Sequence, residues 1–310
     1  MKNYYLKKII SAMIIIFGVL MITFLLIYHL PGNPAEVLAG QRSDPETLAR
    51  IQHEWGLDQP LLMQFWTYAK SILRFDLGES IYTRQKILES LCERFPLTFF
   101  LALAAVFISA LVGLPIGILS AVSPNTFIDR LFLTLTLLGI SMPIFWLGII
   151  VLQLSSHLDS LSLVSNLSPF ITNFFLAAVV LGIRPSALLA RVTRTQMLSQ
   201  LSQDYVMAAR TRGLSAFKIY FRHAFRNCLG PVITVLALDF GSLLGGAAIT
   251  ETIFCLPGIG KLALTGIGRR DYPVIMGMVL FSSVVFVLVN LIVDLILPIL
   301  NPRLREKQTR

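Results

Sequence analysis

Long stretches without any charged residue constrain this chain more than any other feature of its sequence. One of them, from Leu97 to Ile128, contains no Asp, Glu, Lys or Arg. About 20 apolar residues are enough to cross the hydrocarbon core of a bilayer. Only 14% of the 310 residues are charged and 55% are hydrophobic, whereas a soluble domain carries about a quarter charged residues. The chain lacks the polar residues for a water-compatible surface, so an all-α integral membrane protein is predicted.

Six apolar runs predict six transmembrane helices. The first run, from Ile9 to Leu30, is longer than the apolar region of a secretory signal, and no small-x-small cleavage site follows it. We therefore interpret residues 1–30 as an uncleaved first transmembrane helix. The other five helices are expected at about 97–120, 131–154, 171–190, 229–250 and 274–298.

The segments between the runs define the rest of the predicted organisation. Residues 31–95 mix charges of both signs and are expected to form a mostly helical extracytoplasmic loop. Residues 96–300 are expected to form the membrane core, with a basic cytoplasmic loop at 191–228, and residues 301–310 a basic cytoplasmic tail. Lys and Arg concentrate in the segments placed inside, as the positive-inside rule requires. Both termini are therefore expected in the cytoplasm.

Composition and motifs argue against several other functions. The net charge of +9 comes from basic residues placed between apolar runs, which indicates membrane topology rather than a nucleic-acid-binding surface. The three cysteines and four histidines have no metal-ligand spacing, so we expect no metal site. No P-loop, His-Glu-x-x-His or Gly-x-Ser-x-Gly motif is present in the sequence. We therefore expect no catalytic residue and no cofactor bound by this chain.

The basic segment between the fourth and fifth runs has the pattern of two short helices. Apolar residues recur at helical spacing up to Ala209, and Arg212 lies near the C-terminal end of that helix, where the helix dipole favours cations. Gly213 can adopt the left-handed conformation that closes a helix, and Ser215 can cap a second helix at 216–227. Two short helices joined at Gly213 would form a protruding elbow. The elbow is either a docking site for a partner or a helix pair lying on anionic lipid.

The elbow resembles the cytoplasmic coupling loop of type I ABC importer permeases, whose general pattern is Glu-Ala-Ala-x-x-x-Gly. Ala208, Ala209 and Gly213 fit this pattern, and Met207 stands where the family has Glu. The resemblance favours the docking interpretation of the elbow.

Further segments resemble the dipeptide, oligopeptide and nickel branch of the same family. The elbow begins with Asp204 and Tyr205, as in that branch, and continues in a similar way through 222–227. Other similar segments follow in the family's order at 29–34, 56–60, 76–80, 251–254, 257–260, 270–273 and 301–303. The resemblance therefore covers nearly the whole chain.

The resemblance implies a type I ABC importer permease fold in a bacterial inner membrane. It implies one or two separate ABC ATPase subunits, which bind ATP and Mg and dock on the elbow. It also implies a second permease subunit, in a heterodimer, and an extracytoplasmic solute-binding protein. The residues that it assigns to ATPase coupling are Asp204, Tyr205, Ala208, Ala209, Arg212, Gly213 and Leu214.

Two charges of opposite sign lie inside predicted membrane helices. At 1.5 Å of rise per residue, Arg184 lies about 10 Å and Asp239 about 13 Å from the cytoplasmic end of its predicted helix. Such charges are costly in a bilayer and usually face a protein interior or a cavity. They either form a buried ion pair, line the translocation pathway, or snorkel to the interface. Glu251, at the outer end of the fifth helix, either contacts the binding protein or faces water.

The resemblance implies import of di- or oligopeptides by alternating access, driven by the partner ATPase. Import of nickel or a metallophore by the same mechanism is the alternative within the family. An ion-gradient-driven secondary transporter is a further alternative, although the sequence shows no internal inverted repeat and few intramembrane acids.

Overall fold

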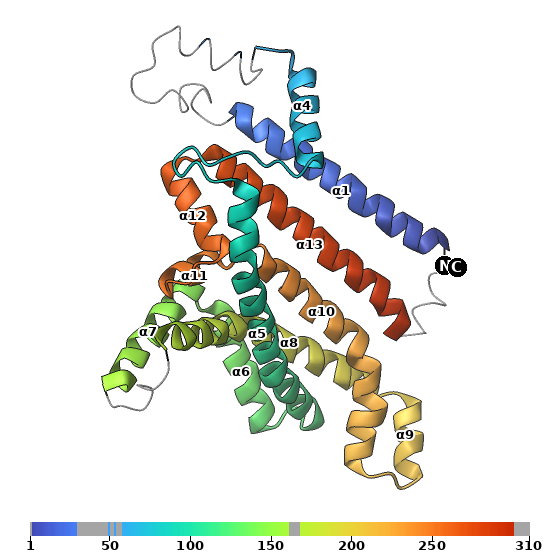
Figure 1. Cartoon of the computed structure of the whole chain (residues 1–310). Coiled ribbons are helices and arrows are strands. Elements are labelled where there is room, and N and C mark those ends of the chain that lie inside the picture. Colours follow the sequence, from blue (N-terminus) through green and yellow to red (C-terminus); the bar gives the residue numbers. More distant parts are fainter. Residues whose placement is uncertain (1, 30–48, 50–52, 54–57, 161–167, 301–310) are drawn as a thin grey trace.

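The computed structural model describes the chain except for residues 1, 30–48, 50–52, 54–57, 161–167 and 301–310. Much of the expected extracytoplasmic loop and the whole basic tail therefore lie outside the described residues. The described part is almost entirely helical (Figure 1). Its helices are α1 (Lys2–His29), α4 (Leu61–Leu73), α5 (Ile87–Val122), α6 (Phe127–Ser141), α7 (Ile144–Ser160), α8 (Pro169–Leu201), α9 (Asp204–Thr211), the π-helix η2 (Lys218–Phe225), α10 (Arg226–Leu244), α11 (Ala248–Ile253), α12 (Ile259–Arg269) and α13 (Tyr272–Leu300).

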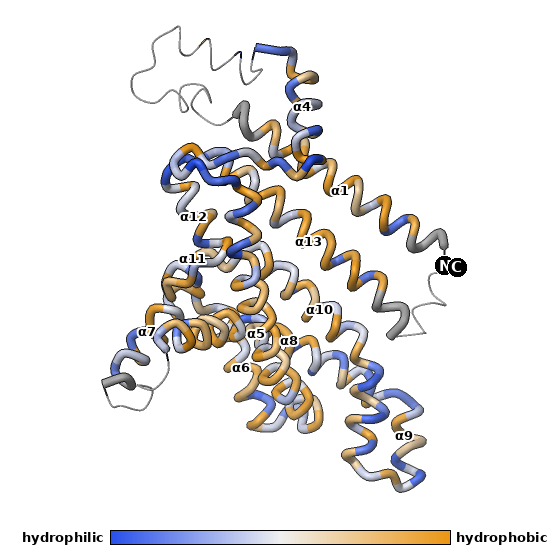
Figure 2. Tube along the Cα trace, in the orientation of Figure 1, coloured by the Kyte–Doolittle hydropathy of each residue, from blue (hydrophilic) through white to orange (hydrophobic). Residues whose placement is uncertain are grey.

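Five of these helical segments are long and apolar enough to cross a membrane. They are Leu6–Leu25, Ile87–Val122, Pro169–Leu201, Lys218–Leu244 and Tyr272–Leu295. Within the described residues, α6 and α7 together provide a sixth candidate span. Figure 2 shows hydrophobic residues along the long helices and hydrophilic residues gathered around α9 at one end and before α5 at the other.

The third apolar run is a bent pair of helices rather than one helix. α6 ends at Ser141, the next residue Met142 is extended, and α7 begins after Pro143 at an angle of 102° to α6. The residue before a proline is disfavoured in the α conformation because the proline ring clashes with it. The single helix expected at 131–154 is therefore incorrect, and Pro143 provides the physical reason.

The fourth apolar helix continues well beyond the expected end at residue 190. α8 runs unbroken through Arg191 to Leu201, so the first third of the predicted loop 191–228 is helix. η2 likewise leads directly into α10, with Arg226 following Phe225 in helical conformation. Two continuous helices therefore connect the elbow to the apolar part of the fold.

The central pair of helices is α5 and α8, which approach closely because small residues line their contact. A Cβ atom on Gly113 would lie 2.6 Å from the carbonyl oxygen of Ser186, and one on Gly117 would lie 2.6 Å from that of Ala190. Any side chain at either glycine would therefore push the two backbones apart. A buried apolar cluster extends this contact toward α7 and α11, and it includes Leu101, Ala105, Ala177, Val180, Leu181, Phe254 and Leu256.

α1 and α10 pack on opposite sides of α13, beside the central pair. α9 projects at one end of the molecule, while α4 and α12 lie at the other (Figure 1). The structure thus has an elbow at one end, formed by α9 and η2, and a group of shorter helices at the opposite end.

Candidate functional site

The elbow has a small hydrophobic core of its own. Val206 and Ala209 from α9 pack against Ile219 from η2, and all three side chains are buried. Leu214 and Tyr220 complete the cluster at its edges. This packing fixes α9 against η2, so the elbow is a rigid unit rather than two independent helices.

The turn after α9 is a Schellman motif, in which a left-handed residue closes a helix by two reversed hydrogen bonds. Gly213 has φ +73°, its N–H donates to the carbonyl oxygen of Arg210 at 2.9 Å, and the N–H of Leu214 donates to that of Ala209 at 3.3 Å. Leu214 also packs in the same cluster as Ala209, the apolar contact that accompanies this motif. The glycine, Leu214 and Ala209 therefore act together to set the angle of the elbow.

Tyr205 ties the elbow to the helices on both sides. Its hydroxyl donates to Oε1 of Gln200, in α8, at 2.8 Å, and accepts from Nδ2 of Asn227, in α10, at 3.0 Å. The same Nδ2 donates to the carbonyl oxygen of His223 at 2.9 Å. One phenol thus links the end of α8, the start of α9 and the start of α10.

The two alanines assigned to ATPase coupling differ in their exposure. Ala208 is exposed, whereas Ala209 is only 6% exposed and lies inside the elbow core. Met207 beside them is 70% exposed. Phe217 and Phe221 are also exposed, and their rings are in contact at 4.6 Å between centroids, with the planes tilted by 35°. Ala208 is therefore the exposed alanine of the elbow, whereas Ala209 is part of its core.

The remaining predicted coupling residues are both exposed. Asp204 and Arg212 are exposed at the two ends of α9, and Asp204 lies in the first turn, where the helix dipole favours an acid. The exposed surface of the elbow therefore combines two charged ends, a small alanine and an aromatic pair.

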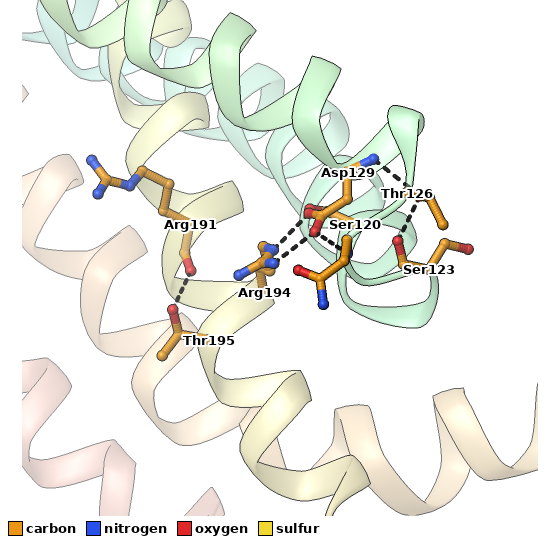
Figure 3. A network of polar contacts seen from close by, with 8 residues as sticks. Ser120, Ser123, Thr126, Asp129, Arg191, Arg194 and Thr195 are labelled. Carbon is orange, nitrogen blue, oxygen red and sulfur yellow. Dashed lines mark hydrogen bonds and ion pairs between the residues drawn. The ribbon is translucent and has the colours of Figure 1, made fainter.

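A buried ion pair holds the C-terminal part of α8 against the start of α6 (Figure 3). Nε and Nη2 of Arg194 each donate to a carboxylate oxygen of Asp129 at 2.7 Å. The carboxylate also accepts the Ser120 hydroxyl and, at 2.9 Å, the backbone N–H of Asn125. Asp129 is 1% exposed, so these donors balance the cost of burying its charge.

The roles of Asp129 and Arg194 were not predicted from the sequence. An acid at the start of an apolar run was the available signal, because such residues are seldom left unpaired beside a membrane. Its partner lies 65 positions away on another helix. The ion pair fixes the segment of α8 that leads into the elbow.

The two intramembrane charges lie on helices that contact each other, without forming an ion pair. Arg184 lies on α8 and Asp239 on α10. Among the described residues, however, no ion pair within 4.0 Å joins them. Oδ2 of Asp239 is buried and has no hydrogen-bond partner in the described part of the chain. The buried ion pair that was one interpretation of the sequence is not formed in this conformation.

Glu251 is fully buried, with 0% exposure, so the expectation of an outer-face contact or a solvent-facing side chain is wrong for this conformation. Its Oε1 accepts from the Thr98 hydroxyl at 2.9 Å, and its Oε2 accepts from the backbone N–H of Lys261 at 2.9 Å. The carboxylate lies at the N-terminus of α12, where the helix dipole stabilises a negative charge. Glu251 therefore joins α5, α11 and α12.

Protein-family models match most of the chain. Residues 113–306 match the binding-protein-dependent transport system inner membrane component, and residues 1–102 match the N-terminal model of the same membrane component. The two models together cover both the elbow and the helices that flank it.

Curated relatives match over nearly the full length. The glutathione transport system permease protein GsiC of Salmonella paratyphi A is 37% identical and matches over 99% of this chain and 100% of its own length. The di/tripeptide transport system permease protein DppB of Pseudomonas aeruginosa is 39% identical over 94% of this chain and 95% of its own. The dipeptide transport system permease protein DppB of Escherichia coli is 35% identical over 99% and 100%.

Among solved structures, the fold is similar to the MetNI methionine ABC transporter in an inward-facing conformation. The TM-score is 0.55 at 17% sequence identity, covering 68% of this chain and 96% of the other. This similarity supports the type I permease fold alone. With the family models and the full-length relatives, it establishes that the chain belongs to the binding-protein-dependent transport system inner membrane components, the membrane-spanning permease subunits of ABC importers.

Proposed function

We propose that this chain forms part of the translocation pathway of an importer for di- or oligopeptides, and that a separate ATPase drives it. Relatives of 35–39% identity are named for transport of glutathione, di- and tripeptides, and dipeptides. Their similarity extends over nearly the full length of each chain, so it includes the helices that would line a pathway. Peptides share a charged amino end and a charged carboxyl end, a chemistry that opposite charges within the membrane can serve.

The ATPase docks on the exposed surface of the elbow. The observation that carries this proposal is the elbow's construction: a rigid helix pair that projects at one end of the fold (Figure 1) and exposes Ala208, Phe217 and Phe221. Exposed aromatic residues are typical of a protein interface, because aromatics contribute much of the binding energy. ATP and Mg are bound by this partner.

The elbow is connected to the membrane interior by two continuous helices. α8 extends from the elbow to Arg184 over 17 residues, which is about 25 Å at 1.5 Å of rise per residue. η2 and α10 form the second connection, which reaches Asp239. A displacement of the elbow therefore moves both helices that carry the intramembrane charges, which is the mechanical link that ATP-driven alternating access needs.

The importer contains two further kinds of subunit. A second permease subunit completes the pathway as a heterodimer with this chain, and an extracytoplasmic solute-binding protein delivers the substrate. The family's description as binding-protein-dependent supports the latter. The long apolar helices provide surfaces that another permease subunit or lipid would cover.

The docking site is tested by co-purification of the ATPase subunits with this chain from mild detergent. The Ala208→Glu variant adds bulk and charge to the exposed small position, and we expect it to lose most of the ATPase. Met63→Glu is the matched control, because Met63 is exposed on α4 at the other end of the fold and the substitution adds the same charge. Equal ATPase recovery with both variants would contradict docking at the elbow.

A further inference from the structure

Arg184 and Asp239 occupy equivalent places on neighbouring helices. Arg184 follows Leu181 by about one turn of α8, and Asp239 precedes Leu243 by about one turn of α10. Leu181 is buried in the apolar cluster between α5 and α8, and Leu243 packs against the same cluster. Both charges therefore lie next to this cluster, on its elbow side.

Neither charge is satisfied in the way that a purely structural ion pair would be. Arg184 is exposed on a helix long enough to span a membrane, and an arginine facing hydrocarbon is costly. Asp239 has a buried oxygen without a hydrogen-bond partner among the described residues, and leaving a buried acceptor unsatisfied is unfavourable. The pattern is typical of a site that is completed by another molecule.

We propose that Arg184 and Asp239 form a binding site for a zwitterionic substrate, with Asp239 accepting hydrogen bonds from its ammonium group and Arg184 donating to its carboxylate. This inference rests on the proposed function, because it assigns the two ends of a peptide to two residues. Guanidinium and carboxylate groups suit these roles, since a hydrogen bond between charged groups is stronger than one between neutral groups.

The position of the site explains how transport and binding are coupled. Arg184 lies on α8 and Asp239 on α10, so each half of the site is carried by one of the two helices that lead from the elbow. A movement of the elbow that changes the separation of these helices changes the separation of the two charges. A substrate held at both ends is then released when the halves move apart.

The test measures equilibrium binding to the importer complex in lipid nanodiscs without its binding protein, so that the binding protein's selectivity does not contribute. The probes are a dipeptide of two alanines, its N-acetyl form and its C-terminal amide. We expect the parent complex to prefer the free dipeptide at least about tenfold over each blocked form, because a hydrogen bond to a charged group is worth about 1.5–3 kcal/mol. Each block removes one of the two proposed contacts.

Two variants should remove these preferences separately. Asp239→Asn should abolish the preference over the acetylated form and keep that over the amide, while Arg184→Gln should do the reverse. Asp294→Asn is the matched control, because Asp294 lies in another candidate span, where it pairs with Lys8 at 2.7 Å. We expect this control to keep both preferences.

Several outcomes would overturn the site. They are a parent without measurable binding at about millimolar peptide, a parent that binds all three probes equally, and variants that weaken the three probes to the same extent. The last outcome would be expected if Arg184 instead meets an acid of the second permease subunit. ATP-driven uptake of the dipeptide by the parent with its binding protein is measured in parallel. If the parent takes up the dipeptide but gives any of these outcomes, only the proposed binding site is refuted. If the parent shows no uptake, the proposed function itself is refuted.

Discussion

Gly213 offers a graded test of how the elbow is built. Its φ of +73° lies in the left-handed region, and a Cβ atom there would meet no described heavy atom within 4 Å. The cost of replacing it therefore comes from the backbone alone, not from crowding. Replacing Gly213 by Asn, Ala, Val and Pro in turn should distinguish a cost that comes from the backbone conformation from one that comes from crowding.

The magnitudes follow from the conformational preferences of the replacements. Asn visits the left-handed region readily, so Gly213→Asn should cost least. Gly213→Ala should destabilise the turn by about 1 kcal/mol, or about fivefold in population, and Gly213→Val by more because it is β-branched. Gly213→Pro fixes φ near −65° and removes the N–H that donates to Arg210. It should therefore cost about 3 kcal/mol or more, about a hundredfold.

The assay is recovery of the ATPase with the detergent-extracted chain, together with ATP-driven uptake by the reconstituted importer. We expect both quantities to fall in the order Asn, Ala, Val, Pro. Parental coupling in Gly213→Pro would refute the account of the turn. If Ala already matched Pro, the account would also be incorrect, because the space beside Gly213 would then be occupied by the partner's surface.

Three further predictions concern residues outside the elbow. Asp129→Ala leaves Arg194, whose side chain is 20% exposed, without its carboxylate, and should lower the free energy of unfolding in an SDS titration by about 3 kcal/mol; a loss below about 1 kcal/mol would show that the pair contributes little. Glu251→Gln places an amide NH2 against buried donors and should cost about 1–3 kcal/mol in the same assay, whereas no change would contradict its buried role. Nδ1 of His53 donates a hydrogen bond to the Asp58 carboxylate at 2.8 Å, which raises the pKa of His53 above 6.5. The stabilisation from this pair is therefore fully present below pH 6.5 and is lost as the pH rises through the raised pKa of His53. In an NMR titration, Asp58→Asn should return the pKa of His53 toward 6.5. An unchanged pKa in this variant would contradict the prediction.

The order of the apolar helices was predictable because each is marked by a local run of residues. The prolines did not predict where a helix breaks. Pro96 and Pro115 lie inside α5 and Pro185 lies inside α8, whereas Pro143 coincides with the break between α6 and α7. The sequence around a proline shows that a break is possible. Whether the helix continues depends on packing against neighbours, which a local pattern does not contain.

The elbow was predictable for the same reason, since its turn depends on a glycine and nearby residues. The identity of Ala209 as a core residue was not, because its burial depends on Ile219 and Leu214 from the far side of the turn. Helical periodicity places Ala208 and Ala209 side by side and leaves open which one faces inward.

Long-range contacts account for what sequence analysis missed. Glu251 accepts a hydrogen bond from Thr98, which is 153 positions away, and the Asp129 carboxylate is bound by Arg194 from another helix. A charged residue near the end of an apolar run has the same local pattern whether it faces water or a distant donor. Only the tertiary arrangement distinguishes the two.

ATP dependence of uptake tests the central claim most directly. The measurement is accumulation of a labelled dipeptide in proteoliposomes that contain this chain, the second permease subunit, the ATPase subunits and the binding protein. We predict uptake that requires ATP and the binding protein, is lost in Ala208→Glu and persists in Met63→Glu. Uptake driven by an ion gradient without ATP, and unaffected by Ala208→Glu, would contradict the account.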